Sequence, residues 1–154
     1  MTQSAIEGVV LRPARPEDYD ALLKLLESAA LPVAGVDAWF DRFVVADSAG
    51  RIVGVAGLEV YGTDGLLRSV AVADDWRRRG LGDALTAAIL QAAARDGITR
   101  VYLLTTTAAE YFPRHGFRRI DREEASDAVK SSLEFGEVCP ASSVVMVRSS
   151  GHVG

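Results

Sequence analysis

Three arginines and a Gly-x-Gly step, Arg77-Arg78-Arg79-Gly80-Leu81-Gly82, form the stretch of this sequence best suited to bind an anion. The stretch follows an apolar segment, residues 66–72, and precedes an alanine-rich segment with helical periodicity. A helix N-terminus has backbone N–H groups without intrahelical partners and a partial positive charge, and glycine lets a phosphate approach closely. The order strand, turn and helix therefore predicts a phosphate site on the amides of residues 78–83. The glycines match neither the Gly-x-Gly-x-x-Gly of dinucleotide folds nor a P-loop.

Glu59 and Arg68 are charged residues in otherwise apolar segments that read as the two strands of a hairpin. A turn over residues 62–65 would place Glu59 opposite Arg68, whereas a turn centred on residues 64 and 65 would shift the pairing by two. Both registers leave the two side chains on one face. An unpaired charge in such strands is costly, so we expect an ion pair.

Two roles for this pair stay open. It is either a structural ion pair or part of a site in which Glu59 takes a substrate ammonium, or its proton through water, while Arg68 holds a carboxylate. A neighbouring guanidinium favours the ionised carboxylate, and this favours ion recognition over strong basicity.

The arginine- and glycine-rich turn, preceded by Ser69-Val70-Ala71-Val72, resembles the acyl-CoA pyrophosphate signature of the GNAT superfamily of N-acetyltransferases, Gln/Arg-x-x-Gly-x-Gly/Ala. The resemblance implies an α/β fold over residues 8–148. Its mixed sheet would have six to seven strands, two of them parallel and splayed, with four to five flanking helices. It also implies acetyl-CoA as acyl donor and direct transfer to an amine in a ternary complex. The backbones of Val70 and Val72 would pair with the pantetheine amides. The implied cofactor-binding set is Val70, Ala71, Val72, Arg77, Arg78, Arg79, Gly80, Leu81, Gly82, Asp83 and Phe112.

A narrower resemblance concerns the segment after the second parallel strand. Leu104-Thr105-Thr106-Thr107, with Tyr111-Phe112 and His115-Gly116-Phe117, is similar to the acetyltransferase domain of N-acetylglutamate synthases. Those enzymes also carry phenylalanine where many GNAT members have a tyrosine, four residues before the glycine. Tyr111 is one residue too early, and on a helix it would point about 100° away. The resemblance assigns Thr105 to the acceptor site and leaves the acid for the departing thiolate unassigned.

Residues 57–62, 66–72 and 139–142 resemble the small acetyltransferases of arsenic-resistance loci. Both resemblances imply a small amine that bears an acid group, such as an amino acid or an arsenical analogue, and Glu59 and Arg68 suit it. Cys139 is expected to be a small loop residue and not an acetyl carrier or arsenic ligand, because it is the only cysteine. The alternative function is a CoA-binding module without catalysis, which only Phe112 favours.

The composition supports a soluble, single-domain protein. The chain has 154 residues and a formal net charge of −4, which argues against nucleic-acid binding. One cysteine and two histidines exclude an internal disulfide and make a poor set of metal ligands. We see neither a signal peptide nor a membrane-spanning segment, so we expect a cytoplasmic enzyme with a small-molecule substrate. The oligomeric state stays open, a homodimer included.

The periodicity of the sequence predicts the elements that would position these residues. Leu81, Leu85, Ile89 and Ala92 should form one buried stripe of the long helix, which would cross over between parallel strands. Residues 149–154 are expected to be a disordered tail. The expected strands are residues 9–13, 43–46, 52–61, 66–72, 101–106, 117–120 and 143–148, and the expected helices are residues 16–30, 37–43, 81–96, 108–115 and 123–135.

Overall fold

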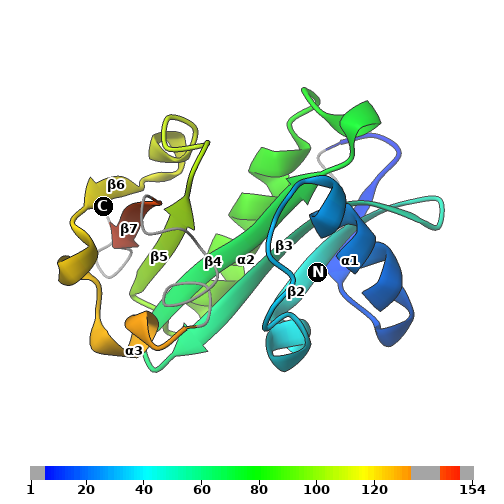
Figure 1. Cartoon of the computed structure of the whole chain (residues 1–154). Coiled ribbons are helices and arrows are strands. Elements are labelled where there is room, and N and C mark those ends of the chain that lie inside the picture. The colour runs from blue at the N-terminus through cyan, green and yellow to red at the C-terminus, as the bar shows by residue number, and fades with distance from the viewer. Residues whose placement is uncertain (1–5, 133–142, 150–154) are drawn as a thin grey trace. The chain divides into compact units, whose positions relative to one another are not determined.

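The computed structural model describes residues 6–132 and 143–149. In this part of the chain seven strands form one mixed sheet in the order β1-β2-β3-β4-β5-β7-β6 (Figure 1). The strands are β1 (Val10–Pro13), β2 (Phe43–Ser48), β3 (Arg51–Tyr61), β4 (Asp64–Val72), β5 (Arg100–Thr105), β6 (Arg118–Ile120) and β7 (Val144–Ser149). The α-helices are α1 (Tyr19–Ser28), α2 (Leu81–Arg95) and α3 (Asp127–Lys130).

The parallel pair that the sequence predicts is β4 and β5. Residues Asp64–Leu66 of β4 are in register with Arg100–Tyr102 of β5, and α2 lies between these strands in the sequence. The neighbouring pairs β1–β2, β2–β3, β5–β7 and β6–β7 are antiparallel. The predicted α/β architecture with a mixed sheet is therefore confirmed.

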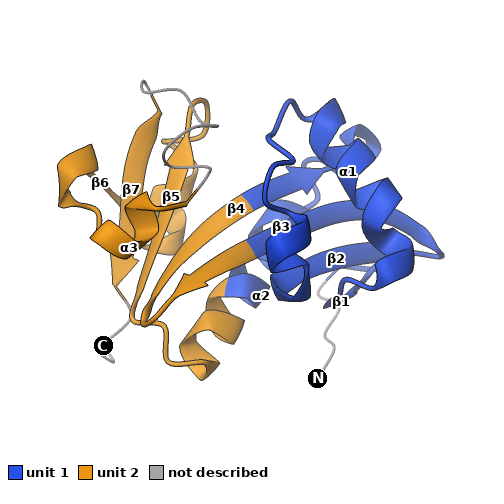
Figure 2. Cartoon of the chain, turned by 60° about the horizontal axis from the view of Figure 1, so that its bottom comes forward, with its two compact units in different colours: residues 1–57, 69–89 blue, residues 58–68, 90–154 orange. Residues whose placement is uncertain are grey.

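The chain divides into two compact units (Figure 2). Unit 1 comprises residues 1–57 and 69–89, and unit 2 comprises residues 58–68 and 90–154. The division falls inside β3, β4 and α2, so these elements contribute to both units. The turn over residues 77–82, which the sequence predicts to bind phosphate and which we call the phosphate turn, belongs to unit 1. Glu59 and Arg68 belong to unit 2.

Two glycines of β3 let neighbouring groups pack closely against the sheet in unit 1. A Cβ on Gly54 would lie 2.8 Å from Cδ1 of Leu85, so α2 packs directly on the strand backbone there. A Cβ on Gly57 would lie 2.5 Å from the ring of Phe43. Because side chains alternate along a strand, positions 54 and 57 face opposite sides of the sheet. The sheet is therefore covered by α2 on one face and by an aromatic cluster on the other.

The aromatic cluster joins β2 to the start of α1. The ring of Phe43 stacks on that of Phe40 at 6.4 Å, and Phe40 contacts Tyr19 edge-on at 5.5 Å. Phe40 lies in the 3₁₀ segment Asp37–Arg42, where the sequence predicts a short helix. This apolar segment therefore contributes to packing within unit 1.

The core of unit 2 lies between β4, β5, β7 and the segment that contains α3. Buried Leu66, Tyr102, Val129, Val145 and Val147 form it together with Ala125. Ser126 caps α3 by accepting the N–H of Val129 at 3.3 Å. The helix carries Val129 into the core, and Ser132, two residues after its end, hydrogen-bonds to Tyr61 of β3.

Several helical segments are shorter than the sequence predicts. Residues 108–115 form a helical turn only over the 3₁₀ segment Phe112–His115, which Gly116 ends at φ +88°. Residues 123–132 contain a 3₁₀ turn and the short α3, because Ser126 starts a new helix instead of continuing one. Residues 133–135 of the expected helix, residues 150–154 of the expected tail, and Cys139 lie outside the described residues. None of the helices in the described residues is long and apolar enough to cross a membrane.

The predicted buried stripe of α2 is correct for three of its four residues. Leu81, Leu85 and Ile89 are buried, but the fourth buried position is Ala93, which is 1% exposed, and not Ala92. The spacing of four residues simply continues from 89 to 93.

Candidate functional site

The β3–β4 hairpin turns over two residues, Gly62 and Thr63. The expected four-residue turn over 62–65 is wrong, because Asp64 and Gly65 already belong to β4. Gly62 adopts φ +66°, as two-residue hairpin turns require. Asp64 accepts hydrogen bonds from Arg100 of β5, the shorter at 3.1 Å, and this pairing favours a strand over a turn.

The shorter turn changes the register but keeps Glu59 and Arg68 together. Because Tyr61 and Asp64 flank the two-residue turn and face each other, Leu66 lies opposite Glu59. Arg68, two residues further along β4, is therefore the diagonal neighbour of Glu59 on the same face. Its long side chain spans this diagonal: Nη1 of Arg68 donates to Oε2 of Glu59 at 2.8 Å. Both residues are buried, Glu59 at 2% and Arg68 at 3% exposure. The predicted ion pair is confirmed, and it is an interior one.

Tyr61 is a further member of this cluster, and its role was not predicted from the sequence. Its hydroxyl donates to Oε1 of Glu59 at 2.5 Å, so each carboxylate oxygen has a donor. Burial, followed by the hydrogen bond to Glu59 and its charge, raises the pKa of Tyr61 to about 12, whereas a hydrogen bond from Ser132 acts in the opposite direction. The position of Tyr61, two residues after Glu59 and thus on the same face of β3, was the signal available in the sequence. Ser132 is distant in the sequence, and no sequence pattern indicated that it would contact Tyr61.

The phosphate turn in unit 1 has the backbone geometry that an anion site needs. Arg78 has φ +66° and Gly80 has φ +81°, both in the left-handed region. The carbonyl of Gly80 accepts the N–H of Ala84 at 3.1 Å, so α2 begins directly after Gly80. The next amides, those of Leu81 and Gly82 among them, belong to the first helical turn, where N–H groups have no intrahelical partner. Nothing lies within 4 Å of a Cβ placed on Gly80, so the space directly beside this residue is open.

Two of the three predicted arginines contact residues at the end of β4 or in the segment that follows it. Nε of Arg77 donates to the carbonyl of Val72 at 3.2 Å, and its Nη2 lies 3.3 Å from Asp74. The guanidinium of Arg79 stacks over Trp76, 4.5 Å from the ring centroid. These contacts fix the turn relative to the end of β4, while all three arginines remain exposed. The contacts of Arg77 and Arg79 shape the turn, and the contribution of the three arginines to coenzyme binding stays a prediction.

The segment of β4 expected to bind pantetheine follows a residue of unusual conformation. Ser69, buried at 7% exposure, has φ +63° inside the strand. A non-glycine residue in this region is strained, and it rotates the adjacent peptide groups relative to the strand ladder. Val70, Ala71 and Val72 follow directly, with the side chain of Ala71 buried and those of the two valines half-buried. No pattern in the sequence signalled this conformation.

Thr105 and Phe112 each make local contacts in unit 2. Oγ1 of Thr105 accepts the N–H of Ala108 at 2.9 Å and so stabilises the turn after β5. Phe112 is buried and packs edge-on against Phe117 at 5.8 Å. Tyr111 contacts Phe112 at 5.0 Å and lies under Arg114 at 4.8 Å, so its ring has a packing role. These contacts leave the assignments of Thr105 to the acceptor and of Phe112 to the cofactor as predictions.

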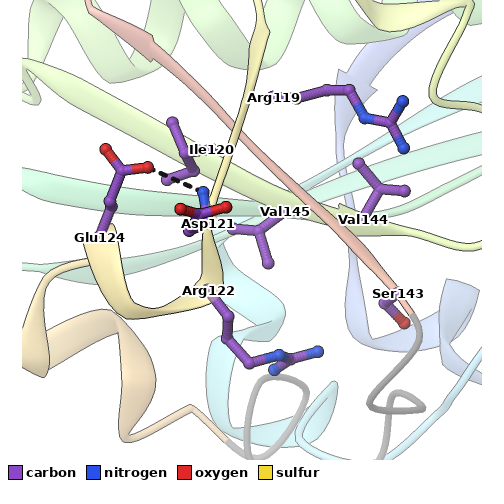
Figure 3. Close-up of a pocket in the computed structure, with 8 residues that line it drawn as sticks. All are labelled: Arg119, Ile120, Asp121, Arg122, Glu124, Ser143, Val144 and Val145. Atoms are coloured by element: carbon purple, nitrogen blue, oxygen red, sulfur yellow. Dashed lines mark hydrogen bonds between the residues drawn. The ribbon is translucent and has the colours of Figure 1, made fainter.

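A hollow of about 440 Å³ lies in unit 2 at the end of the β6–β7 pair (Figure 3). Arg119 and Arg122 extend toward the side on which Ser143 lies, and Asp121 and Glu124 lie on the other side. Glu124 accepts the N–H of Asp121 at 2.8 Å. The two cations and two anions balance, and none of the predicted site residues lines this hollow. Within residues 6–132 and 143–149, no group of three His, Cys, Asp or Glu side chains is placed to hold a metal ion.

The similarity to known proteins agrees with this geometry. Residues 39–119 match the acetyltransferase (GNAT) domain family. The chain is 31% identical over 140 residues to the amino-acid acetyltransferase of Mycobacterium tuberculosis, covering 84% of this chain and 77% of that protein. It therefore belongs to the GNAT acetyltransferase family, and the predicted family is confirmed.

Other relatives share only part of their length with this chain. The amino-acid acetyltransferase of Aeromonas salmonicida is 28% identical over 119 residues, which are 76% of this chain and 26% of that protein. That of Pasteurella multocida is 29% identical over 144 residues, 87% of this chain and 33% of that protein. The chain thus spans about a quarter to a third of the length of these two relatives.

Two solved structures show the same fold. The N-acetylglutamate synthase of Neisseria gonorrhoeae, complexed with coenzyme A and N-acetyl-glutamate, superposes with a TM-score of 0.80 at 22% identity, over 96% of this chain and 36% of that one. A Mycobacterium tuberculosis protein in complex with CoA gives a TM-score of 0.78 at 26% identity, over 91% of this chain and 98% of that one.

Proposed function

We propose that this chain transfers the acetyl group of acetyl-CoA to the amine of a small, carboxylate-bearing acceptor of the amino-acid class. The observation that carries the proposal is the turn before α2, where left-handed Arg78 and Gly80 precede the first helical amides. Its backbone donors suit the diphosphate of CoA. Family membership supports the reaction, and the names of the relatives support the class of acceptor.

The reaction needs a neutral amine, a polarised thioester carbonyl and a stabilised thiolate. The amine nitrogen attacks the carbonyl carbon, a C–N bond forms, the C–S bond breaks, and the nitrogen loses a proton. Backbone groups beside Val70 would hold the pantetheine arm and polarise the carbonyl. Holding both reactants in one ternary complex supplies much of the rate, and a thiolate leaves without strong acid assistance.

The Glu59–Arg68 pair supports an acceptor that is both an amine and an acid. Arg68 would attract the acceptor carboxylate and Glu59 the ammonium. Because both side chains are buried, an acceptor would approach them through Tyr61, the half-buried member of the cluster. Thr105 would add an acceptor contact from the turn after β5. An arsenical amino-acid analogue fits the same chemistry, in line with the resemblance to acetyltransferases of arsenic-resistance loci. We further propose that residues 8–148 act as one acetyltransferase domain in the cytoplasm.

A thiol-release assay tests the proposal. Purified protein is incubated with acetyl-CoA and glutamate, other amino acids, or amino-acid-like arsenicals and phosphinates, and free CoA is measured. We expect release with amino-acid-like acceptors, and little with the same compounds after esterification of the carboxylate. Release only with peptides would contradict the acceptor class. Binding of acetyl-CoA without release across the panel would favour a non-catalytic CoA-binding module.

A further inference from the structure

The hydroxyl of Tyr61 joins the buried Glu59 carboxylate to a more exposed part of unit 2. Oε2 of Glu59 accepts from Arg68 at 2.8 Å, and Oε1 accepts from Tyr61 at 2.5 Å. Glu59 and Arg68 are buried at 2% and 3% exposure, whereas Tyr61 is half-buried. Tyr61 is therefore the member of the cluster that a substrate reaches first.

The hydroxyl groups of this cluster are oriented in one direction. An ionised carboxylate only accepts hydrogen bonds, so the single hydroxyl proton of Tyr61 is committed to Glu59. The hydrogen bond between Ser132 and Tyr61 must then run from Oγ of Ser132 to Oη of Tyr61. The Ser132 proton thus points toward Tyr61, and the Tyr61 proton points toward Glu59. This orientation allows a proton that arrives at Oη to be passed inward.

We propose that Tyr61 relays the proton of the acceptor amine to Glu59. The inference rests on the proposed acetyl transfer and assigns its base. As the acceptor ammonium donates to Oη of Tyr61, its N–H bond breaks and a new O–H bond forms on Oη. The original Oη–H bond breaks in the same movement, and that proton binds Oε1 of Glu59. The amine becomes neutral, Tyr61 keeps one proton throughout, and Glu59 becomes an uncharged acid.

Tyr61 suits a relay better than a base of its own. With its pKa raised to about 12, the phenol keeps its proton at neutral pH, and it can accept one proton only while releasing another. The hydrogen bond from Ser132, at the end of the α3 segment, and the hydrogen bond to Glu59 of β3 together position the phenol. Protonation of Glu59 removes the negative charge that faces the buried Arg68 guanidinium, which favours return of the proton along the same path after product release.

The pH dependence of Tyr61→Phe tests the relay. Phenylalanine keeps the ring and removes the hydroxyl, so kcat/KM with the best acceptor should fall by about 10²-fold or more at neutral pH, as for the loss of a general base. The deficit should shrink as the pH rises and the acceptor amine becomes neutral without help. Ser132→Ala should show a smaller deficit of the same form. Acetyl-CoA affinity, measured by calorimetry, should stay unchanged in both variants.

Two control variants remove hydroxyl groups from the same unit. Tyr102→Phe changes a core tyrosine, and Ser131→Ala changes the exposed serine beside Ser132. Both should keep the wild-type pH profile. Wild-type activity in Tyr61→Phe, or a deficit that is the same at every pH, would overturn the relay alone. No CoA release by the wild-type chain with any acceptor would overturn the proposed function and the relay together.

Discussion

Nη1 of Arg68 lies 2.8 Å from Oε2 of Glu59, and both side chains are removed from solvent. A buried ion pair gains Coulomb energy but loses the hydration of both charges, so its net contribution to stability is small or even unfavourable. Removing one partner is different, because the remaining charge is then buried without compensation. The pair should therefore behave as one unit in mutagenesis.

Arg68→Met should destabilise the protein by about 3–5 kcal/mol, because it leaves the Glu59 carboxylate buried without its counter-charge. Adding Glu59→Leu in the same chain should recover much of this loss. The free energy of unfolding from urea titration measures both effects. Arg51→Met, at an ion pair between exposed side chains of Arg51 and Asp75, serves as the control and should change stability little. If the double variant lost as much free energy of unfolding as the Arg68 and Glu59 single variants together, the coupling would be contradicted.

The stability of unit 1 should fall at acid pH as Asp18 becomes protonated. Hydrogen bonds from Arg12, at 2.7 Å and 3.0 Å, are the largest cause that lowers the pKa of Asp18 below its usual value. The stabilisation is present above the ordinary pKa of an aspartate, about 3.9, and is lost as the pH falls through the lower folded-state pKa. In thermal melts below pH 5, Asp18→Asn should show a shallower loss of Tm than the wild type. Asp20→Asn, at an exposed position of α1, is the matched control. If Tm fell with decreasing pH equally steeply in the wild type and in Asp18→Asn, the result would contradict the role of this ion pair.

The ionisation of Tyr61 should be detectable in an alkaline titration followed by absorbance. Its pKa of about 12 lies above the ordinary tyrosine value of about 10. A raised pKa in the folded state means that the stabilisation is complete below pH 10 and is lost as the pH rises toward 12. Phenolate absorbance should therefore contain a late component that Tyr61→Phe removes and that Glu59→Gln moves to lower pH. A titration of Tyr61→Phe that retains the late component would assign it to another tyrosine.

The sequence predicted the features that depend on local pattern. The strand–turn–helix unit around Gly80, the parallel relation of β4 and β5, and the Glu59–Arg68 pair all follow from periodicity, motif and the cost of an unpaired charge. The predictions are wrong where the local backbone structure depends on a contact with a residue distant in the sequence. Asp64 extends β4 because Arg100 pairs with it from β5, and this shortens the predicted turn to two residues.

Two parts of the site had weak signals or none. Tyr61 lies on the face of Glu59, but its role depends on a hydrogen bond that only the folded hairpin defines. Ser132 approaches from a segment some seventy residues away, and the left-handed Ser69 in β4 is a conformation that serine rarely adopts. Non-local contacts and strained backbone cannot be read from the pattern of a single sequence.

The matched pair Gly80→Ala and Gly50→Ala isolates the phosphate turn. Both glycines have positive φ, +81° and +92°, and open space at the position of a Cβ, so alanine strains both backbones alike. Gly50 lies in the turn between β2 and β3, whereas Gly80 precedes the helical amides that would hold the diphosphate. The two variants should lose similar stability and differ only in binding.

Calorimetric titration of acetyl-CoA into the wild type and these two variants tests the central claim most directly. We expect one binding site per chain in the wild type, at least about tenfold weaker binding in Gly80→Ala, and wild-type affinity in Gly50→Ala. Failure of the wild type to bind acetyl-CoA, or equal affinity in all three proteins, would contradict the claim that the start of α2 holds the coenzyme.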